Sequence, residues 1–326
     1  MPKALVTGCA GLIGSHLVDA LLTKKYNVVG FDDLSVGKLS HVEHNLRNSN
    51  FTFQNVDVSD FDQVQKYRHL CRQSNVIVHF ASAKKPYETA RESPMLLQNV
   101  RATENMLELA RTEKCRFIYA SSSDVYGYGN VPMKETDDLC IGASNVKRWS
   151  YAVSKIYGEH LCFGYYKDFD VPIVVLRYFG CFGERASVSW SGGHAMVFIK
   201  AILDDEEVTI HGDGKQTRSM CHVSDVVNGT VKAIETPEAV GEIINIGGTD
   251  EMSVLDFALL VGKVLRRKPR VKFVPFKNLA GNYKEIMRRL PDLSKARNIL
   301  NSSPRVSTTE AIRRTAKWIQ ETKPKK

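Results

Sequence analysis

The chain has 326 residues, of which 43% are hydrophobic and 25% charged, the proportions of an ordinary globular protein. No apolar run reaches the roughly 18 residues that a membrane span requires, so a transmembrane protein is excluded. Lysine and arginine exceed aspartate and glutamate by nine, but they are scattered and form no recognition module, which favours a phosphorylated substrate over nucleic acid.

The cellular setting follows from the N-terminus and the cysteines. The N-terminus lacks the charged, apolar and cleavable parts of a secretory signal, so we do not expect secretion. The seven cysteines are odd in number and far apart, which predicts reduced thiols, no disulfide framework and no metal site. We therefore expect a cytoplasmic protein.

The first 180 residues predict alternating strands and helices. The predicted strands are Lys3–Thr7, Asn27–Phe31, Phe51–Val56, Val76–Ala81, Arg116–Ser121 and Pro172–Phe179, and the helices are Leu12–Leu22, Phe61–Arg72, Pro94–Thr112 and Tyr151–Phe169. In the third helix, Ser93 is the expected cap and Pro94 the first helical residue. Apolar strands separated by helices are typical of a parallel sheet covered on both faces. The predicted fold class is α/β with a doubly wound, Rossmann-type sheet.

After residue 180 the pattern loosens, and a Ser- and Gly-rich stretch, Arg185–His194, predicts a loop. Helices are predicted at Met196–Leu203, Ser224–Ile234, Ser253–Arg266 and near Thr309–Ile319, and strands at Val208–His211, Glu242–Ile246 and Arg270–Pro275. The strand at 242–246 is expected to return to the main sheet. We therefore predict a first domain at residues 1–179, joined by 221–250, and a smaller α+β lobe formed mainly by 180–326.

The strongest local motif runs from Thr7 to Ser15, between the first strand and the first helix. Gly8 allows a tight turn, Gly11 lets the backbone approach a pyrophosphate at the helix N-terminus, and Gly14 lets helix and strand pack closely. Asp32, followed by Asp33, ends the second strand. A carboxylate there accepts hydrogen bonds from ribose hydroxyls and repels a 2′-phosphate, which favours NAD over NADP.

A second motif, Tyr151-Ala152-Val153-Ser154-Lys155, lies on a predicted helix. Positions i and i+4 share a helix face, so the ammonium of Lys155 is expected near the phenol of Tyr151. A nearby cation favours the phenolate and lowers the tyrosine pKa toward working pH. Together with the glycine motif, this spacing predicts a tyrosine that acts as a base.

At this point the sequence resembles the extended short-chain dehydrogenase/reductase superfamily, in particular its NAD-dependent nucleotide-sugar epimerases, dehydratases and decarboxylases. The resemblance covers nearly the whole chain. The stretch from Thr7 to Gly14 is similar to TGxxGxxG, His79–Lys84 to the H-x-A-x-x-K segment beside the nicotinamide, and Ser121–Gly127 to the active-site S-[ST]-x-x-V-Y-G. Arg177-Tyr178-Phe179 and His211–Arg218 resemble two further signatures of the superfamily.

The resemblance implies a residue set for each part of the site. For NAD the set is Gly8, Gly11, Leu12, Ile13, Gly14, Asp32, Asp33, Asp57, Val58, Phe80, Ala81, Ser82, Lys84, Asn99, Tyr151, Lys155 and Tyr178. Asp57 and Val58 match the adenine-contacting pair, and Asn99 occupies a position that stabilises the central helices. For catalysis the set is Ser122, Asp124, Tyr151 and Lys155, and for the substrate it is Ser123, Gly180, Arg218 and Arg289.

Alignment on Val125-Tyr126-Gly127 places the catalytic hydroxyl at Ser122. The resemblance implies that this hydroxyl bonds the sugar O4 while Tyr151 removes its proton and the C4 hydride passes to NAD. The resemblance can be followed over the three positions that begin at this hydroxyl. The dehydratases have Thr-Asp-Glu there and the glucuronate decarboxylases Thr-Ser-Glu, and in many 4-epimerases the third of these residues is small and neutral. This chain has Ser122-Ser123-Asp124, which leaves two interpretations of Asp124 open, an acid–base group or a residue that caps the turn.

The second lobe carries a less complete resemblance. Lys147–Tyr151 is similar to the R-W-x-Y segment of bacterial UDP-glucuronate decarboxylases and plant apiose/xylose synthases. Arg288–Asp292 is similar to their R-x-P-[DS] segment, which implies that Arg289 meets the diphosphate or the uronate of the substrate. Arg218 matches a phosphate-contacting arginine, although the usual Asp-Phe after it is replaced by Ser-Met. Gly180 stands where many relatives carry an asparagine that contacts the sugar nucleotide.

We expect an NAD-dependent nucleotide-sugar 4-epimerase, with a UDP-sugar as the first candidate substrate, acting through a transient 4-keto sugar. A UDP-glucuronate decarboxylase stays open as the alternative, followed by a 4,6-dehydratase, in which Ser123 would replace the acid. A non-catalytic dinucleotide-binding regulator is disfavoured because Tyr151 and Lys155 are both present. The expected partners are a nucleotide-diphosphate sugar and, by resemblance, a second copy packed through the helices at 94–112 and 151–169. No nucleic acid or membrane partner is expected.

Overall fold

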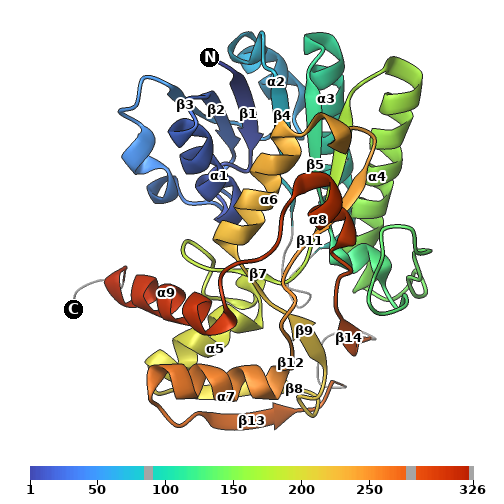
Figure 1. Ribbon diagram of the computed structural model, residues 1–326. Coiled ribbons are helices and arrows are strands. Elements are labelled where there is room, and N and C mark those ends of the chain that lie inside the picture. The colour runs from blue at the N-terminus through green and yellow to red at the C-terminus, as the bar shows by residue number, and fades with distance from the viewer. Residues whose placement is uncertain (84–90, 277–283, 323–326) are drawn as a thin grey trace.

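The computed structural model describes residues 1–83, 91–276 and 284–322 (Figure 1). Its centre is a sheet of seven parallel strands in the order β11-β6-β5-β4-β1-β2-β3. The strands are β1 (Lys3–Thr7), β2 (Asn27–Asp32), β3 (Phe51–Asn55), β4 (Val76–His79), β5 (Arg116–Ser122), β6 (Ile173–Tyr178) and β11 (Ile243–Ile246). The predicted doubly wound α/β fold is confirmed.

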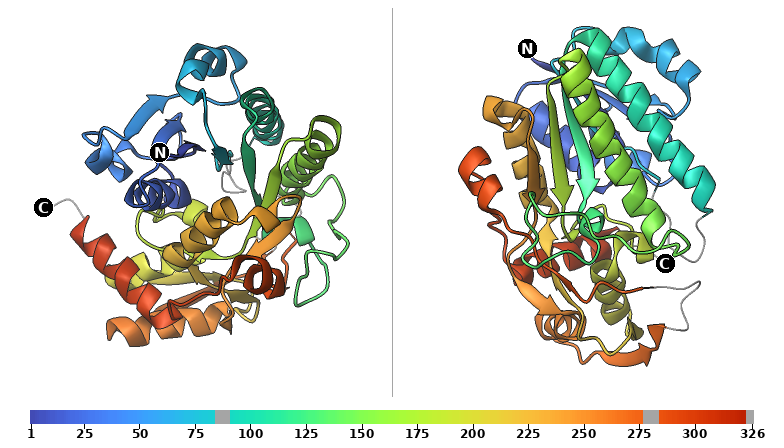
Figure 2. Two further views of the ribbon diagram at one scale, coloured as in Figure 1. Left: turned by 45° about the horizontal axis from the view of Figure 1, so that its top comes forward. Right: turned by 90° about the vertical axis from the view of Figure 1, so that its right-hand side faces the viewer.

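Helices cover both faces of the sheet because its strands are apolar on both. One face packs on α1 (Leu12–Thr23), α6 (Val223–Glu235) and α8 (Ser294–Leu300). The other packs on α2 (Phe61–Tyr67), α3 (Glu92–Glu113) and α4 (Trp149–Phe169). Figure 2 shows α3 and α4 running side by side. All six residues of β6 are buried, as expected of a central parallel strand.

A close approach sets the position of α4 against β5. A Cβ atom built on Gly158 of α4 would lie 2.0 Å from Tyr119 Oη, so only glycine permits this helix–strand distance. The Lys155 ammonium donates to the carbonyl of Ala120, one residue further along β5, at 2.8 Å. Helix α4 is therefore fixed against the strand that ends in Ser122.

The second lobe has its own core, formed by α5 (His194–Leu203), α7 (Val254–Leu265) and α9 (Thr308–Glu321) (Figure 1). Small sheets complete it: β8 (Glu207–His211) with β13 (Arg270–Val274); β9 (Thr217–Ser219) between β12 (Glu251–Ser253) and β14 (Arg288–Arg289); and β7 (Cys181–Phe182) with β10 (Cys221–His222). Short 3-10 helices are η1 (Leu39–His41), η2 (Glu43–Asn45), η3 (Arg68–Cys71), η4 (Ser123–Tyr126), η5 (Trp190–Gly192) and η6 (Pro237–Ala239). Within the described residues, no helix is long and apolar enough to cross a membrane.

Several details differ from the sequence-based prediction. Helix α3 begins at Glu92 with Arg91 as its N-cap, so the prediction of a Ser93 cap was wrong, and Pro94 is the third helical residue. The predicted helix at 61–72 ends at Tyr67 and continues as η3, whereas α8 and five strands of two or three residues were not predicted. The returning strand is confirmed, because β11 pairs with β6 in parallel. The domain limits stay a prediction.

Candidate active site

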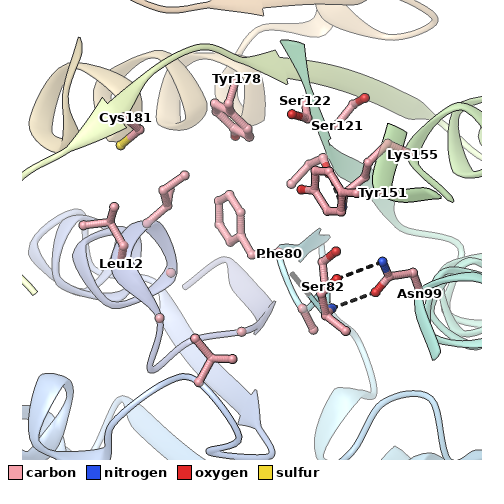
Figure 3. A pocket seen from close by; sticks show the side chains of 18 of the residues that line it. Leu12, Phe80, Ser82, Asn99, Ser121, Ser122, Tyr151, Lys155, Tyr178 and Cys181 are labelled. Carbon is pink, nitrogen blue, oxygen red and sulfur yellow. Dashed lines mark hydrogen bonds between the residues drawn. The ribbon is translucent and has the colours of Figure 1, made fainter. Parts of the chain in front are cut away.

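A cavity of about 460 Å³ lies at the carboxyl ends of the strands, where the sheet meets the second lobe (Figure 3). Residues after β1, β2, β4 and β5 line it together with residues of α4 and of the second lobe. The strand order reverses between β4 and β1, and ligands of doubly wound sheets bind at such a switch point. This cavity is therefore the candidate active site.

The glycine motif forms the turn between β1 and α1 at one end of the cavity. Gly8 has a φ of +69°, and its N–H donates to the carbonyl of Phe31 at 2.8 Å. A Cβ atom on Gly14 would lie 2.1 Å from the Gly8 oxygen, so the turn has no room for a side chain there. Gly11 is the N-cap of α1, and Leu12 and Ile13 line the cavity beside it. The helix N-terminus thus faces the cavity, a suitable place for a pyrophosphate.

Asp32, at the end of β2, is buried beside this turn. Its carboxylate accepts hydrogen bonds from the N–H groups of Ala10 and Leu34 at 2.8 and 2.9 Å. Burial raises the pKa of Asp32, and these two hydrogen bonds oppose the rise. Asp32 therefore also orders the glycine turn, a role that sequence reasoning missed. Asp33 accepts from the backbone and hydroxyl of Ser35 and lies at the cavity wall.

The segment after β4 forms another wall, with Phe80, Ala81 and Ser82 lining the cavity. Asn99 of α3 holds this segment, because its side chain accepts from the Ala83 N–H at 2.7 Å and donates to the Ala83 carbonyl at 3.1 Å (Figure 3). The structure thus gives Asn99 a positioning role as well as a place at the cavity. Lys84 lies outside the described residues.

Asp57 and Val58, the predicted adenine pair, also line the cavity. The Asp57 carboxylate accepts from the backbone N–H and the hydroxyl of Ser59, at 2.9 and 2.7 Å. The carboxylate therefore shapes the loop after β3, while Val58 contributes an apolar wall. The glycine turn, the Asp32 carboxylate and this apolar wall together fit a dinucleotide.

Ser122, Tyr151 and Lys155 meet at the other end of the cavity (Figure 3). The Lys155 Nζ lies 5.8 Å from the centre of the Tyr151 ring, as the i, i+4 spacing on α4 predicts. The Ser122 hydroxyl accepts from the Asp124 N–H at 3.2 Å and lies 3.4 Å from Asp124 Oδ2. The structure therefore brings the three residues of the predicted hydroxyl–phenol–ammonium set to one place.

Asp124 reaches across the cavity to the second lobe. Its Oδ1 lies 2.9 Å from Arg289 Nη2 and 3.6 Å from Arg148 Nη2. Arg289 Nη1 also donates to the Ser123 hydroxyl at 3.4 Å. The carboxylate that distinguishes this chain thus lies among guanidinium groups, next to the predicted catalytic serine.

Arg218 and Glu285 form the continuation of this charged cluster. Arg218 donates to Glu285 Oε1 at 2.8 Å and to the carbonyls of Thr217 and Ile286. Burial acts to raise the pKa of Glu285, but Arg218, Arg148 and Arg289 lower it below its ordinary value. Arg218 therefore anchors the 285–289 segment to β9, and its role in phosphate binding stays a prediction.

Tyr178 and Gly180 close the cavity near β6. The buried Tyr178 hydroxyl pairs with the Thr230 hydroxyl at 2.9 Å, and burial raises the pKa of this tyrosine. Gly180 has a φ of +28°, and a Cβ atom there would lie 2.3 Å from the Ser219 oxygen. The backbone, and not a side chain, therefore forms this part of the wall.

His194 lines the cavity at the start of α5, and sequence reasoning missed it. Its ring makes edge contacts with Phe198 and Phe257, with centroid distances of 5.6 and 5.5 Å. Burial, followed by the nearby charge of Arg218, lowers the pKa of His194 to about 3. A neutral imidazole thus lies near the arginines. The only sequence signal for a functional histidine at this position is that it directly follows two glycines, Gly192 and Gly193.

Comparisons with known proteins agree with this geometry. The sequence profile of the NAD dependent epimerase/dehydratase family matches residues 4–247. The chain is 34% identical over 321 residues to a UDP-N-acetyl-alpha-D-glucosaminuronate decarboxylase of Bacillus cytotoxicus, with 98% of each chain covered. A UDP-glucuronic acid 4-epimerase of Bacillus cereus, solved with UDP-glucuronic acid and NAD, superposes with a TM-score of 0.87 at 33% identity, covering 98% of this chain and 99% of that one. A UDP-glucose 4-epimerase of Thermotoga maritima gives 0.86 at 26% identity, with the same coverage.

Proposed function

Because the chain belongs to the NAD-dependent epimerase/dehydratase family, we propose that it inverts C4 of a UDP-sugar through a transient 4-keto sugar. Bound NAD supplies the hydride acceptor for C4. The residues that would hold NAD are those of the glycine turn, Asp32 and the wall formed by Phe80, Ala81 and Ser82. All remaining chemistry belongs to side chains of this protein.

The proton step uses three residues. The Ser122 hydroxyl orients the sugar O4, and the Tyr151 phenolate takes its proton as C4 is oxidised. The Lys155 ammonium, 5.8 Å from the Tyr151 ring centre, stabilises that phenolate. When the keto sugar turns and is reduced on its other face, Tyr151 returns the proton.

The contact between Asp124 and Arg289 is the observation that favours epimerisation over the other reactions of the family. The Asp124 carboxylate contacts Arg289 at 2.9 Å, and an inversion at C4 requires no further acid at this position. Asp124 is then a structural partner of the arginine that binds the substrate's diphosphate. This assignment also explains why a shorter Asp serves where the decarboxylases carry Glu.

One observation favours a second function, the decarboxylation of a UDP-linked uronic acid. Two guanidinium groups, from Arg289 and Arg148, surround the carboxylate next to Ser122, and the same groups could hold a uronate. The relative from Bacillus cytotoxicus bears the name of such a decarboxylase. In this case Asp124 would take part in proton transfer after C4 oxidation.

Product mass distinguishes the two functions. The purified protein with NAD is incubated separately with UDP-glucose, UDP-N-acetylglucosamine, UDP-glucuronate and UDP-N-acetylglucosaminuronate. We expect an epimer of unchanged mass, identified by its sugar proton couplings in NMR. A product that has lost CO2 would establish the second function instead, and loss of water would indicate a dehydratase.

Replacing the phenol tests the proton step itself. Tyr151→Phe keeps the ring but removes the proton acceptor, so kcat should fall by at least about 100-fold with KM little changed. NAD binding, measured by calorimetry, should persist. Near-normal turnover of this variant would rule out the mechanism.

A further inference from the structure

A buried ion pair lies one helical turn beyond Lys155. The Glu159 carboxylate of α4 binds the Arg177 guanidinium of β6 through two hydrogen bonds, at 2.9 and 2.7 Å. The two residues are only 4% and 3% exposed. The Arg177 guanidinium also lies 4.7 Å from the centre of the Tyr126 ring. Both partners are thus held in a single arrangement.

The pair shares a helix face with the proposed catalytic groups. Tyr151, Lys155 and Glu159 follow one another at steps of four residues on α4. Lys155 binds the carbonyl of Ala120, and the hydroxyl of Ser121 donates to Glu159 at 2.5 Å. Two adjacent residues of β5, Ala120 and Ser121, therefore bind two α4 side chains that lie one helical turn apart. The next residue along the strand is Ser122 (Figure 3).

Lys155 and Glu159 carry opposite charges on one helix face, and each has hydrogen-bond partners of its own on the sheet. Residues four positions apart are neighbours on a helix surface, so opposite charges at this spacing attract each other, although lysine before glutamate is the weaker order. Here Arg177 and Ser121 hold the carboxylate of Glu159, while Lys155 binds β5 beside Tyr151. If Glu159 were released, it would be an anion one turn from the ammonium on which the Tyr151 phenolate depends.

We propose that Arg177 is a positioning residue, which binds Glu159 and thereby keeps the Lys155 charge available to Tyr151. The proposal rests on the proposed roles of Tyr151 and Lys155 in the proton step. It applies equally to epimerisation and decarboxylation, because both begin with the same oxidation at C4.

Other titratable groups lie on the elements that pack against Tyr151 and Lys155, and their charges also bear on the ionisation of the phenol. Within the described residues they are His79 of β4, Tyr119 of β5, Asp124 of η4, Glu92 of α3 and Cys162 of α4. Burial lowers the pKa of His79 to about 3 and raises the pKa of Tyr119 and of Cys162, so all three are neutral at working pH. Asp124 contacts Arg289, and Glu92 accepts a hydrogen bond from Ser150. Glu159 is therefore the anion whose release would affect Lys155 most directly.

A two-residue cycle tests the proposal. In Arg177→Gln the charge of Glu159 is freed, so the phenolate loses stabilisation and the acid limb of the kcat/KM profile should move up by about one pH unit. Activity at pH 7 should then fall by about tenfold. In Glu159→Gln no anion is released, so the limb should stay in place. The double variant, Arg177→Gln with Glu159→Gln, should return the limb to its original position although Arg177 is still missing.

A spectroscopic measurement gives the same quantity without turnover. The ultraviolet titration of each protein is compared with that of the same protein carrying Tyr151→Phe, which isolates the ionisation of this phenol. The midpoint should rise in Arg177→Gln and return in the double variant. A structural role alone would lower the rate of all three variants and leave this midpoint unchanged.

The outcomes separate the proposal from the proposed function. If Tyr151→Phe is inactive but Arg177→Gln leaves limb and midpoint unmoved, the positioning role of Arg177 is wrong. If Tyr151→Phe retains turnover, the proposed proton step fails first. If Arg177→Gln does not fold, Ser121→Ala removes the second partner of Glu159 and should shift the midpoint in the same direction by a smaller amount; no shift would overturn the proposal.

Discussion

His79 is a fully buried histidine at the end of β4, behind the nucleotide site. Its Nδ1 pairs with the Thr7 hydroxyl at 2.8 Å, and its Nε2 lies 3.5 Å from the Thr103 hydroxyl. The Thr103 hydroxyl donates to the carbonyl of Asn99, and the Thr7 oxygen accepts from the Ala81 N–H, so this network suits a neutral imidazole. Burial, and then the charge of Lys155, lowers the pKa of His79 to about 3.

The depressed pKa predicts acid sensitivity. In the unfolded chain this histidine is protonated below about pH 6.5, whereas in the folded protein it stays neutral down to about pH 3. The contribution of His79 to the free energy of unfolding is therefore fully present above about pH 6.5 and is lost as the pH falls below it. Between pH 7.5 and 5.5 this group should lower the free energy of unfolding by about 1.4 kcal/mol, measured by urea titration. His79→Gln should show a pH sensitivity smaller by that amount. The exposed His69→Gln is the control, and equal pH sensitivity of all three proteins would contradict the prediction.

Asp124 decides between the two proposed reactions. Asp124→Asn preserves the shape beside Arg289, so an epimerase should lose less than about tenfold in kcat, or roughly 1.4 kcal/mol in activation free energy. A decarboxylase or dehydratase would lose an acid–base group and about 100-fold in rate. Reduced cofactor would then accumulate after C4 oxidation and be visible by its absorbance. We expect the mild effect, and accumulation would favour the second function.

Arg289 gives an independent test of the same choice. As a clamp on the diphosphate it contributes equally to substrate and transition-state binding, so Arg289→Met should raise KM with kcat little changed. As a partner of a uronate it would also lower kcat. Steady-state kinetics on the active substrate measures both constants, and we expect the effect on KM alone.

At the scale of elements, helix α4 offers a matched pair of glycines. A Cβ atom on Gly158 would lie 2.0 Å from Tyr119 Oη, whereas a Cβ atom on Gly164 would have nothing within 4 Å. Gly158→Ala should therefore destabilise the protein by about 1–3 kcal/mol through overpacking. Gly164→Ala should stabilise it by about 0.5–1 kcal/mol, because alanine is the better helix former.

Unfolding in urea measures the stability of both glycine variants, and kcat provides a second measurement. Gly158→Ala forces α4 away from β5, which displaces Lys155 from the Ala120 carbonyl and should lower kcat as well. Gly164→Ala should keep kcat. Similar stabilities for the two variants would show that the contact with Tyr119 does not set the helix position.

The elements that sequence predicts well are those whose pattern is local. The central strands are continuous apolar runs, and β1 has the predicted limits because each of its residues from Ala4 to Thr7 is buried. Strands β9 and β14 could not be predicted, since two or three residues carry no periodicity and their pairing joins Thr217 to Arg288 across 71 positions. The Ser93 cap failed because the helix already begins at Glu92, with Arg91 as an N-cap that makes no side-chain hydrogen bond, so no capping residue marks its start in the sequence.

The same limit applies to the site. The glycine turn is found from sequence because it joins a strand to a helix, and Tyr151 and Lys155 because they share a helix face, whereas Ser122 was assigned from the family resemblance. Glu285 meets Arg218 and Arg148 only through tertiary packing, and no spacing in the sequence brings them together. His194 was predicted to lie in a loop but begins α5 and reaches the cavity.

For the whole molecule, the family resemblance implies a homodimer, and exposed apolar residues on α3 and α4 are candidates for its interface. Leu97 of α3 and Val153 and Tyr157 of α4 are 51%, 42% and 50% exposed. Two copies related by a twofold axis would cover these residues with the same residues of the partner. Analytical ultracentrifugation should show a homodimer, and Val153→Asp with Tyr157→Asp should give a folded monomer. Leu259→Asp, at an equally exposed site on α7, should leave the dimer intact and is the control.

The return of β11 to the sheet has a consequence for synthesis on the ribosome. Strand β11 is the edge strand beside β6, yet the chain builds β7 to β10, α5 and α6 before reaching it. Until residue 246 has emerged, the nascent sheet ends at β6, with an open row of backbone N–H and C=O groups. The sheet therefore cannot be completed before β7 to β10, α5 and α6 have been synthesised, although its first strand begins the chain. A chaperone that shields open sheet edges should bind nascent chains of 180 to 240 residues more strongly than shorter or longer ones.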